Sequence, residues 1–535
     1  MKRFDSLPVL VTFIVVSTCG RLPAQGEPAG LWKNQDVRGR LILPARDPAA
    51  ARLVQSTVNG YLQRGFGVKV PVAERSSEAH LNILAGTPEN NTALAQLLRE
   101  GFKLTDEELG DEGFQLVSHE AGGKQYVVVY GHTPRALKHG CQELVFYRLA
   151  ATISEGALEW PLNVVMKPQV PYRGCYILPC WAAYDSVENW ARVLRFNSEL
   201  TLNRNWFWLD GFPVAGHTGE YGETDLAREE NVQQLLDLAA DEAMKILIGG
   251  GWFNWHHAQA VGGSLDKGID YYLRYLEVFR NFHGFYIEPT GEGGESQAWR
   301  DQVNALLRLI AQVHERRPEF EFALATGKFN NPEYHRKLAT LDPARVFWWW
   351  CWGDPVRDEA MKLFPSVLRW HVIARMSDFQ GSTAPPDILE KDLAGVATGY
   401  DPGQGFGDPW DGWGRLGVRK PRNVDPYSIP YFGHQYYYRE RCWNLKLSEW
   451  DFTLRLGRRL FDADAPRHCG NSYWWISKMV LAASSNQHPT EEQLAHHRAF
   501  LAETQKRAWS PRMLDTLERM ERALQQLTRL SAAHE

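Results

Sequence analysis

Three carboxylates lie close together in the segment GFYIEPTGEGGE (284–295): Glu288, Glu292 and Glu295. Glu292 lies among glycines, which allow a backbone to approach a ligand closely. Several carboxylates at one place suit the cleavage of a glycosidic bond, which needs one acid and one base or nucleophile. The alternatives are that these acids bind a metal, pair with arginine or cap the following helix.

Other acids and aromatic residues follow later apolar runs. Asp354 lies in the stretch CWGDP, and Asp378 lies in MSDF. The segment YDPGQGFGDPWDGWG (400–414) contains Trp410 and Trp413 among glycines and aspartates. This composition is typical of a substrate loop, and its alternative is a tight loop whose aspartates cap turns. Asp354 and Asp378 are candidates for a second catalytic carboxylate.

Further polar and aromatic side chains are candidates for sugar binding, and we expect them near the same site: Arg204, Asn205, Trp208, His257, Tyr437 and Arg439. An arginine can hold a sugar carboxylate by a bidentate contact, and a structural Arg–Glu pair explains Arg439 equally well. The adjacent His256 and His257 point apart, so we expect no shared metal. The sequence has no GxSxG, HExxH or P-loop motif, and it predicts no metal or cofactor.

The elements that would position these residues alternate between strand and helix from Arg173 onward. The expected strands lie in the segments 173–178, 202–211, 245–251, 284–295, 321–327, 345–354, 367–375 and 395–400. Eight such units favour an α/β fold, a (β/α)8 TIM-like barrel, whose active site lies at the carboxyl ends of the strands. Alternation along the fourth strand places Phe285 on the helix side and aims Glu288 into the mouth. The last three units have weak helices, so an open doubly wound sheet is the alternative.

The flanking regions have other patterns. Residues 40–168 predict a small α+β domain, with strands, a helix that starts at Asp47 and a hairpin at 113–131. Residues 26–38 are expected to be an irregular leader. The barrel is expected over 172–442, and residues 443–535 are predicted to be helical throughout.

Composition narrows the function classes. Lys and Arg number 59 and Asp and Glu 64, for a net charge of −5, which argues against a nucleic-acid binder held by bulk charge. The 21 Trp, 20 Tyr and 24 Phe indicate either a large core or a cleft lined by flat rings that pack on sugars. Six cysteines besides Cys19 are too few for a disulfide scaffold. A bridge between Cys175 and Cys180 is the alternative to buried free thiols.

The first residues resemble a secretory signal peptide. A positive start is followed by a short apolar run, and cleavage after Ala24 would remove residues 1–24. The sequence therefore predicts an exported protein, periplasmic or extracellular, with a lipid anchor at Cys19 as the alternative. No later segment is apolar enough to span a membrane.

Three stretches resemble known glycoside hydrolases. YVVVYGHTPRALKHGCQELVFYRL (126–149) is similar to the end of the small domain before the barrel in α-glucuronidases and bacterial β-hexosaminidases. RFNSELTLNRNWFWLDG (195–211) resembles their early barrel, and EPTGEGGE (288–295) resembles the Ser-Glu-Gly stretch of family 67 α-glucuronidases. That match implies that Glu292 is the general acid. The chain departs from both patterns, because Gly291 replaces the hexosaminidase Asp and the glucuronidase Ser is absent.

The sequence thus predicts an exported glycosidase that acts on poly- or oligosaccharides, with uronic-acid-bearing ones among the candidates. Glu292 would protonate the leaving oxygen, and Glu288, Asp354 or Asp378 would activate water or attack the sugar. One alternative is a carbohydrate-binding barrel without catalysis. Another is a metal-dependent hydrolase or lyase that uses Glu288, Glu292 and a nearby histidine. The sequence does not indicate the oligomeric state.

Overall fold

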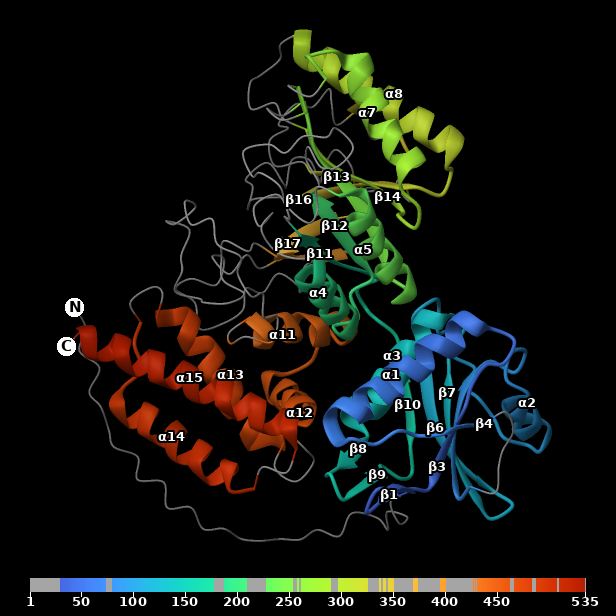
Figure 1. Ribbon diagram of the computed structural model, residues 1–535, viewed down its shortest axis with the longest axis vertical. Helices are drawn as coiled ribbons and strands as arrows, with labels where there is room; N and C mark the ends of the chain where they lie inside the picture. Colours follow the sequence, from blue (N-terminus) through green and yellow to red (C-terminus); the bar gives the residue numbers. More distant parts are fainter. Residues whose placement is uncertain are drawn as a thin grey trace.

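The computed structural model describes most of the chain outside the loops that follow the barrel strands. The described residues are 29–73, 79–177, 187–208, 228–253, 257–258, 261–289, 297–325, 336–337, 340–342, 345–350, 369–373, 395–400, 427, 429, 431–461, 466–483, 487–507 and 510–534. The barrel occupies the upper half of Figure 1. An N-terminal domain and a group of C-terminal helices lie side by side below it, and helices of the two are in contact.

The N-terminal domain is built on a six-stranded mixed sheet in the order β10-β6-β7-β5-β3-β4. Its strands are β3 (Gly39–Ile42), β4 (Val72–Ala73), β5 (Leu81–Gly86), β6 (Phe114–Ala121), β7 (Lys124–Tyr130) and β10 (Asn163–Met166). Helices α1 (Pro48–Phe66) and α3 (Pro134–Tyr147) cover one face, and α2 (Thr92–Arg99) covers the other. Alternation along β7 explains both layers, because Val127 joins the cluster of α1 and α3 while Val128 joins that of α2. The predicted hairpin and the Asp47 cap of α1 are confirmed.

A second, four-stranded sheet in the order β2-β1-β9-β8 borders this domain. Its strands are β1 (Ala29–Lys33), β2 (Asp36–Val37), β8 (Leu149–Ala151) and β9 (Glu155–Leu158). The expectation of an irregular leader over 26–38 is therefore wrong for residues 29–37. Trp32 of β1 is fully buried against Phe66 and Gly156, so this strand is part of the core.

Eight parallel strands close into the barrel. They are β11 (Tyr172–Ile177), β12 (Arg204–Trp208), β13 (Lys245–Trp252), β14 (Gly284–Pro289), β15 (Glu321–Ala325), β16 (Val346–Trp350), β17 (Arg369–Ile373) and β18 (Gly395–Tyr400). Continuous pairing of β11 with β18 along their whole length closes the ring. The predicted barrel is thus confirmed, and the open sheet is excluded. The described outer helices are α4 (Val187–Glu199), α5 (Glu229–Asp241), α7 (Leu265–Val278) and α8 (Gln297–Arg316).

Five helices complete the described chain: α11 (Tyr431–Trp443), α12 (Glu449–Leu460), α13 (Pro466–Ala483), α14 (Glu491–Gln505) and α15 (Pro511–His534). They confirm the predicted helical region. Helix α11 carries the GHQYYYRERCW segment, whose helical form the sequence analysis did not predict. Within the part of the chain that the structure describes, no helix is long and apolar enough to cross a membrane.

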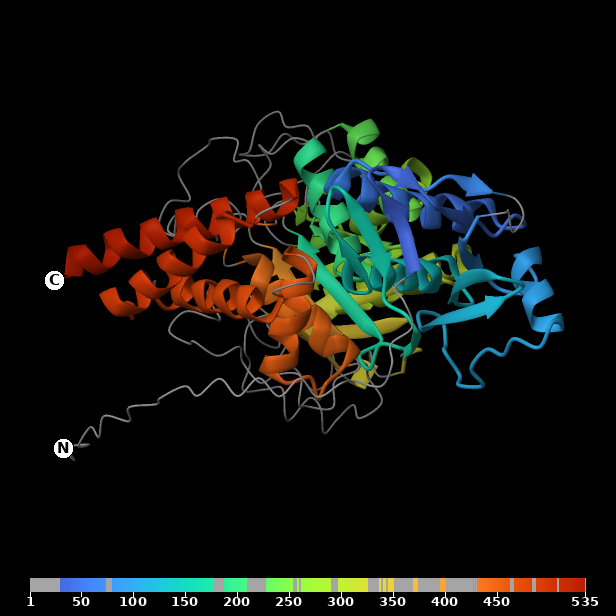
Figure 2. The ribbon, with the colours of Figure 1, turned by 90° about the horizontal axis from the view of Figure 1, so that it is seen from below.

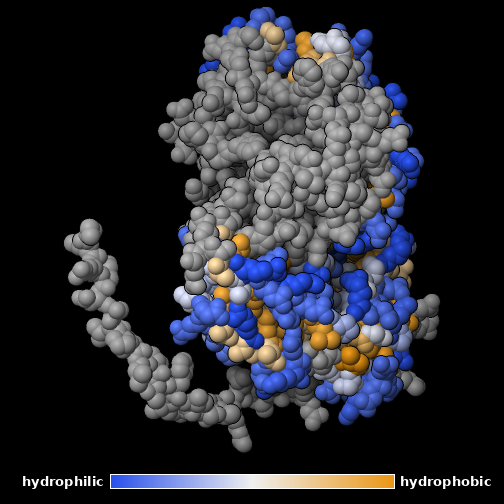
Figure 3. Space-filling model, turned by 60° about the vertical axis from the view of Figure 1, so that its left-hand side comes forward, coloured by the Kyte–Doolittle hydropathy of each residue, from blue (hydrophilic) through white to orange (hydrophobic). Residues whose placement is uncertain are grey.

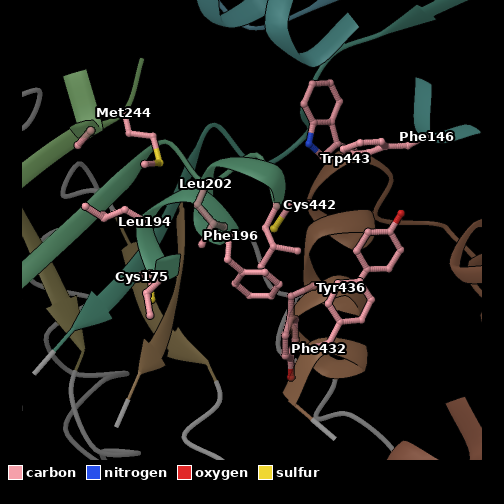
Figure 4. Close-up of a cluster of buried hydrophobic side chains, with 14 of the residues drawn as sticks. Phe146, Cys175, Leu194, Phe196, Leu202, Met244, Phe432, Tyr436, Cys442 and Trp443 are labelled. Atoms are coloured by element: carbon pink, nitrogen blue, oxygen red, sulfur yellow. The ribbon is translucent and has the colours of Figure 1, made fainter. Parts of the chain in front are cut away.

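A continuous core joins the three regions (Figure 4). Phe196 of α4 contacts Phe432 of α11, and the α11 residue Trp443 packs on Phe114 and His139 of the N-terminal domain. Cys141, Cys442 and Cys469 are buried free thiols, and Cys175 is buried as well. Cys180 lies outside the described residues, so the bridge between Cys175 and Cys180 stays a prediction.

Candidate active site at the mouth of the barrel

The candidate site lies at the carboxyl ends of the eight strands. Every strand of the closed barrel runs parallel to its neighbours, so all of these ends meet on one face. The last residue of β14 is Pro289, directly before the segment with Glu292. The backbone of Glu288 pairs with that of Gly251 on β13, one residue from the end of both strands. The backbone of Glu288 therefore lies at the mouth, and the predicted direction of its side chain stays a prediction.

The face that each β14 residue presents follows from its outer contacts. The Phe285 ring packs against Tyr272 and Tyr275 of α7, on the helix side of the strand. Alternation then places Tyr286 on the inner face, where it is fully buried. This confirms the predicted alternation along β14 for Phe285 and Tyr286.

Most of the predicted catalytic and aromatic residues lie outside the described residues: Glu292, Asp354, Asp378, Trp410 and Trp413. Trp208 is the last residue of β12, and its backbone pairs with Gly249, but its side chain is not described. The assignments of these residues therefore stay predictions.

Arg204 is not at the rim, contrary to expectation. It is the first residue of β12, at the opposite, amino end of the barrel. Its guanidinium donates two 2.8 Å hydrogen bonds to the carboxylate of Glu321, the first residue of β15. Lys245, the first residue of β13, also contacts Glu321, and the Arg204 guanidinium lies 4.2 Å from the centre of the Tyr172 ring. Arg204 therefore anchors the base of the barrel.

Asn205 is also placed away from the mouth. It follows Arg204 on β12 and so faces the outer helices. Asn197 of α4 donates a 2.7 Å hydrogen bond from Nδ2 to Oδ1 of Asn205, and both side chains are buried. Asn205 attaches α4 to the sheet rather than binding a sugar.

His257 is a core histidine. Its ring packs among Trp252, Phe253 and Tyr272, and Nδ1 accepts a 2.9 Å hydrogen bond from the backbone N–H of Phe253. Burial lowers the pKa of His257 to about 4, so the ring is neutral near pH 7. A buried neutral imidazole that already accepts this bond explains the residue without a substrate.

Tyr437 and Arg439 lie on α11, which packs against α12 and α13. Tyr437 stacks on Trp474 of α13 with 5.6 Å between the ring centres. Arg439 is buried and donates a 2.6 Å bond to Glu440. The structural Arg–Glu alternative is therefore correct for Arg439, and both residues are corrections to the predicted sugar-binding set.

Sequence reasoning missed the buried charges at the base of the barrel. Glu112 of the N-terminal domain contacts Arg173 at the start of β11, and Arg135 of α3 donates a 3.0 Å bond to it. Burial opposes the charged form of Glu112, but the two arginines outweigh it and hold its pKa well below the usual range. The signal in the sequence was position along the strand: Lys245 and Glu321 are the first residues of β13 and β15, and Arg173 is the second residue of β11.

The described residues contain no group of three or more His, Cys, Asp or Glu side chains that could hold a metal ion. The strand-end segments that carry most of the predicted acids lie outside that set.

Fold and site together define a closed (β/α)8 barrel with an α+β domain in front and helices behind. Solved structures with this layout include the GH20 β-N-acetylhexosaminidase from Streptomyces coelicolor A3(2), with a TM-score of 0.52 and 14% identity over 85% of this chain and 94% of that one. The GH84 protein CpGH84B matches with a TM-score of 0.56 and 11% identity over 90% of this chain and 80% of that one. A GH138 enzyme that targets pectin rhamnogalacturonan II matches at 0.53 and 12% identity over 84% of this chain and 55% of that one.

No family model matches the sequence, and a comparison with curated proteins gives no match either. At these identities the likeness establishes the fold. The chain therefore has the fold of glycoside hydrolases of the β-hexosaminidase type, which confirms the resemblance at the level of architecture.

Proposed function

We propose that this protein is an exported glycoside hydrolase whose active site lies at the mouth of the barrel. The observation that carries the proposal is the position of β14: it ends at the mouth, and the acid-rich segment 290–295 follows it directly. The barrel closes at every strand pair, so the carboxyl ends of all eight strands lie on this one face. The fold shared with GH20, GH84 and GH138 structures supports the same reading.

The chemistry assigned to the site is acid–base cleavage by two carboxyl groups. Glu292 gives its proton to the glycosidic oxygen as the bond to the anomeric carbon breaks, so the leaving sugar departs as a neutral alcohol. A second carboxylate, from Glu288, Asp354 or Asp378, either deprotonates the attacking water or attacks the anomeric carbon itself. Trp208, Trp410 and Trp413 offer flat rings for the sugar faces.

The substrate is proposed to be a uronic-acid-bearing poly- or oligosaccharide. This finer assignment rests on the likeness of EPTGEGGE to the α-glucuronidase motif. Export rests on the basic start, the short apolar run and the cleavage position after Ala24. Neither assignment depends on the barrel.

The test is turnover on a panel of oligosaccharides that includes glucuronoxylan fragments, with wild type compared with Glu292→Gln. Loss of a general acid costs about 10²–10⁴ in rate on a natural linkage. The loss should be much smaller on an aryl glycoside, because a good leaving group needs little protonation. Glu277→Gln, an exposed position on α7, is the matched control and should keep full activity.

Three results would contradict the proposal in different ways. Full turnover by Glu292→Gln removes the acid assignment but keeps the enzyme class. Tight binding of a glycan without turnover favours a non-catalytic carbohydrate-binding barrel. Activity that is abolished by a chelator and restored by one divalent ion favours a metal-dependent hydrolase or lyase.

A further inference from the structure

A cavity of about 600 Å³ lies among the C-terminal helices, between α13 and α14. Its described walls come from α13, α14, the residue after α12 and the start of α15, and no barrel strand contributes to it. The volume lies within the range of about 300–1,000 Å³ that is typical of small-molecule sites. On the face that Figure 3 turns forward, apolar patches interrupt the polar surface in the lower half of the molecule, where these helices lie.

The inner part of the cavity is aromatic. Phe461 and Phe500 line it together with Trp475, whose indole stacks on His497 at 3.9 Å between ring centres and a 17° angle. Ser472 lies 2.8 Å from Nδ1 of His497, which fixes the imidazole and, through the stack, the indole. Burial lowers the pKa of His497 to about 4, so both stacked rings are uncharged near pH 7.

The outer part of the cavity is polar. Asn471 of α13 contributes an amide that has no hydrogen-bond partner among the residues that the structure describes. Across the cavity, Glu503 accepts bonds from Lys506 at 3.0 Å and from Arg507 at 3.5 Å. An amide, a carboxylate and a guanidinium therefore face an aromatic wall, and planar polar groups of this kind can form paired hydrogen bonds with neighbouring hydroxyl groups.

We propose that this cavity is a second glycan-binding site, which holds one or two sugar units of a chain. The aromatic wall would pack on the C–H face of the sugar, while Asn471, Glu503 and Arg507 would bond its hydroxyl groups. A purely apolar ligand would leave the Asn471 amide without a hydrogen-bond partner, whereas Glu503 and Arg507 already contact each other. The biological use of the site rests on the proposed function. A polymer that is bound in this cavity reaches the barrel mouth at a raised effective concentration, so its overall affinity for the protein increases.

The experiment measures binding of soluble glucuronoxylan by affinity electrophoresis and calorimetry, with the intact chain carrying Glu292→Gln so that no substrate is consumed. Trp475→Ala and Asn471→Ala should each weaken binding, Trp475→Ala by about tenfold. Trp450→Ala is the matched control, because Trp450 is an exposed tryptophan on α12 that does not line the cavity. Loss of Trp475 could destabilise the helices, so Asn471→Ala is the second test variant. Asn471 is half-buried at the edge of the cavity, and its truncation should leave the helices folded.

The outcomes separate this inference from the proposed function. Binding that depends on Trp475 and Asn471 but not on Trp450 supports the second site, whether or not the barrel hydrolyses anything. Equal binding by all variants overturns it, even if wild type cleaves glycans. Absence of glycan binding by the parent protein also overturns it. In the active background, loss of the site should raise KM on the polymer and leave kcat on short fragments unchanged.

Discussion

Replacing Glu321 by methionine should destabilise the protein more than replacing Arg204, although the two residues form one ion pair. Arg204 is 6% exposed and is held by two 2.8 Å bonds to Glu321. In Glu321→Met its charge stays buried without a counter-ion, which costs about 3–5 kcal/mol. In Arg204→Met the carboxylate keeps Lys245, whose side chain is one-third exposed and can adjust. We therefore expect about 1–3 kcal/mol for Arg204→Met.

The assay is urea unfolding of both single variants and of the double variant. The double variant should recover part of the loss of Glu321→Met, because it leaves no unpaired arginine. A larger loss for Arg204→Met than for Glu321→Met would refute the reasoning, as would a loss below about 1 kcal/mol for Glu321→Met. A third result would restore the rim assignment for Arg204: normal stability of Arg204→Met combined with lost glycan binding.

Two further perturbations test other parts of the fold. Burial raises the pKa of Glu143, but the charge of Arg455 outweighs burial and lowers the pKa to about 2. The ionised Glu143 therefore stabilises the folded protein near pH 7, and this stabilisation is lost as the pH falls from about 5 towards 2. Glu143→Gln should therefore lower Tm at pH 7 and lose that difference in acid, and a difference that is the same at every pH would contradict this. Gly249→Ala should abolish soluble expression, because its Cβ would lie 1.9 Å from the backbone oxygen of Tyr286, whereas Gly30→Ala meets nothing within 4 Å and should behave as wild type.

The barrel was predictable because its strands are apolar runs and the first of them alternate with helices of regular periodicity. The eight expected ranges all contain or closely overlap the observed strands. The small sheet that contains β1 was not predictable, because its strands are short and β1 pairs with a strand more than a hundred residues away in sequence. Lys33 of β1 pairs with Glu155 of β9. Such pairing is decided by long-range packing, here the burial of Trp32, which local sequence does not reveal.

Single residues were harder to place than elements. The expected strand at 202–211 begins two residues before β12 and ends three residues after it. The expectation that Arg204 lies near the sugar site is wrong because Arg204 is the first residue of β12, at the amino end of the barrel. Helix α11 has little separation of polar and apolar faces, because it is buried on most sides: Phe432, Tyr436 and Tyr438 are all nearly inaccessible. A helix enclosed in this way gives no amphipathic signal, so the sequence predicts no helix for the segment that carries Tyr437 and Arg439.

The position of a charge along a barrel strand distinguishes anchoring from chemistry better than its residue type does. Arg204, Lys245 and Glu321 open their strands, and Arg173 is the second residue of β11. Each of these charges is paired within the base of the barrel or with the N-terminal domain. The domain in front thus closes the amino end with compensated charges, and a charge satisfied there has no capacity left for substrate. Glu288 lies at the carboxyl end of β14, next to the last residue that pairs with β13. The same reasoning that removes Arg204 from the candidate site therefore keeps Glu288 and the segment after it as the place to look for the reaction.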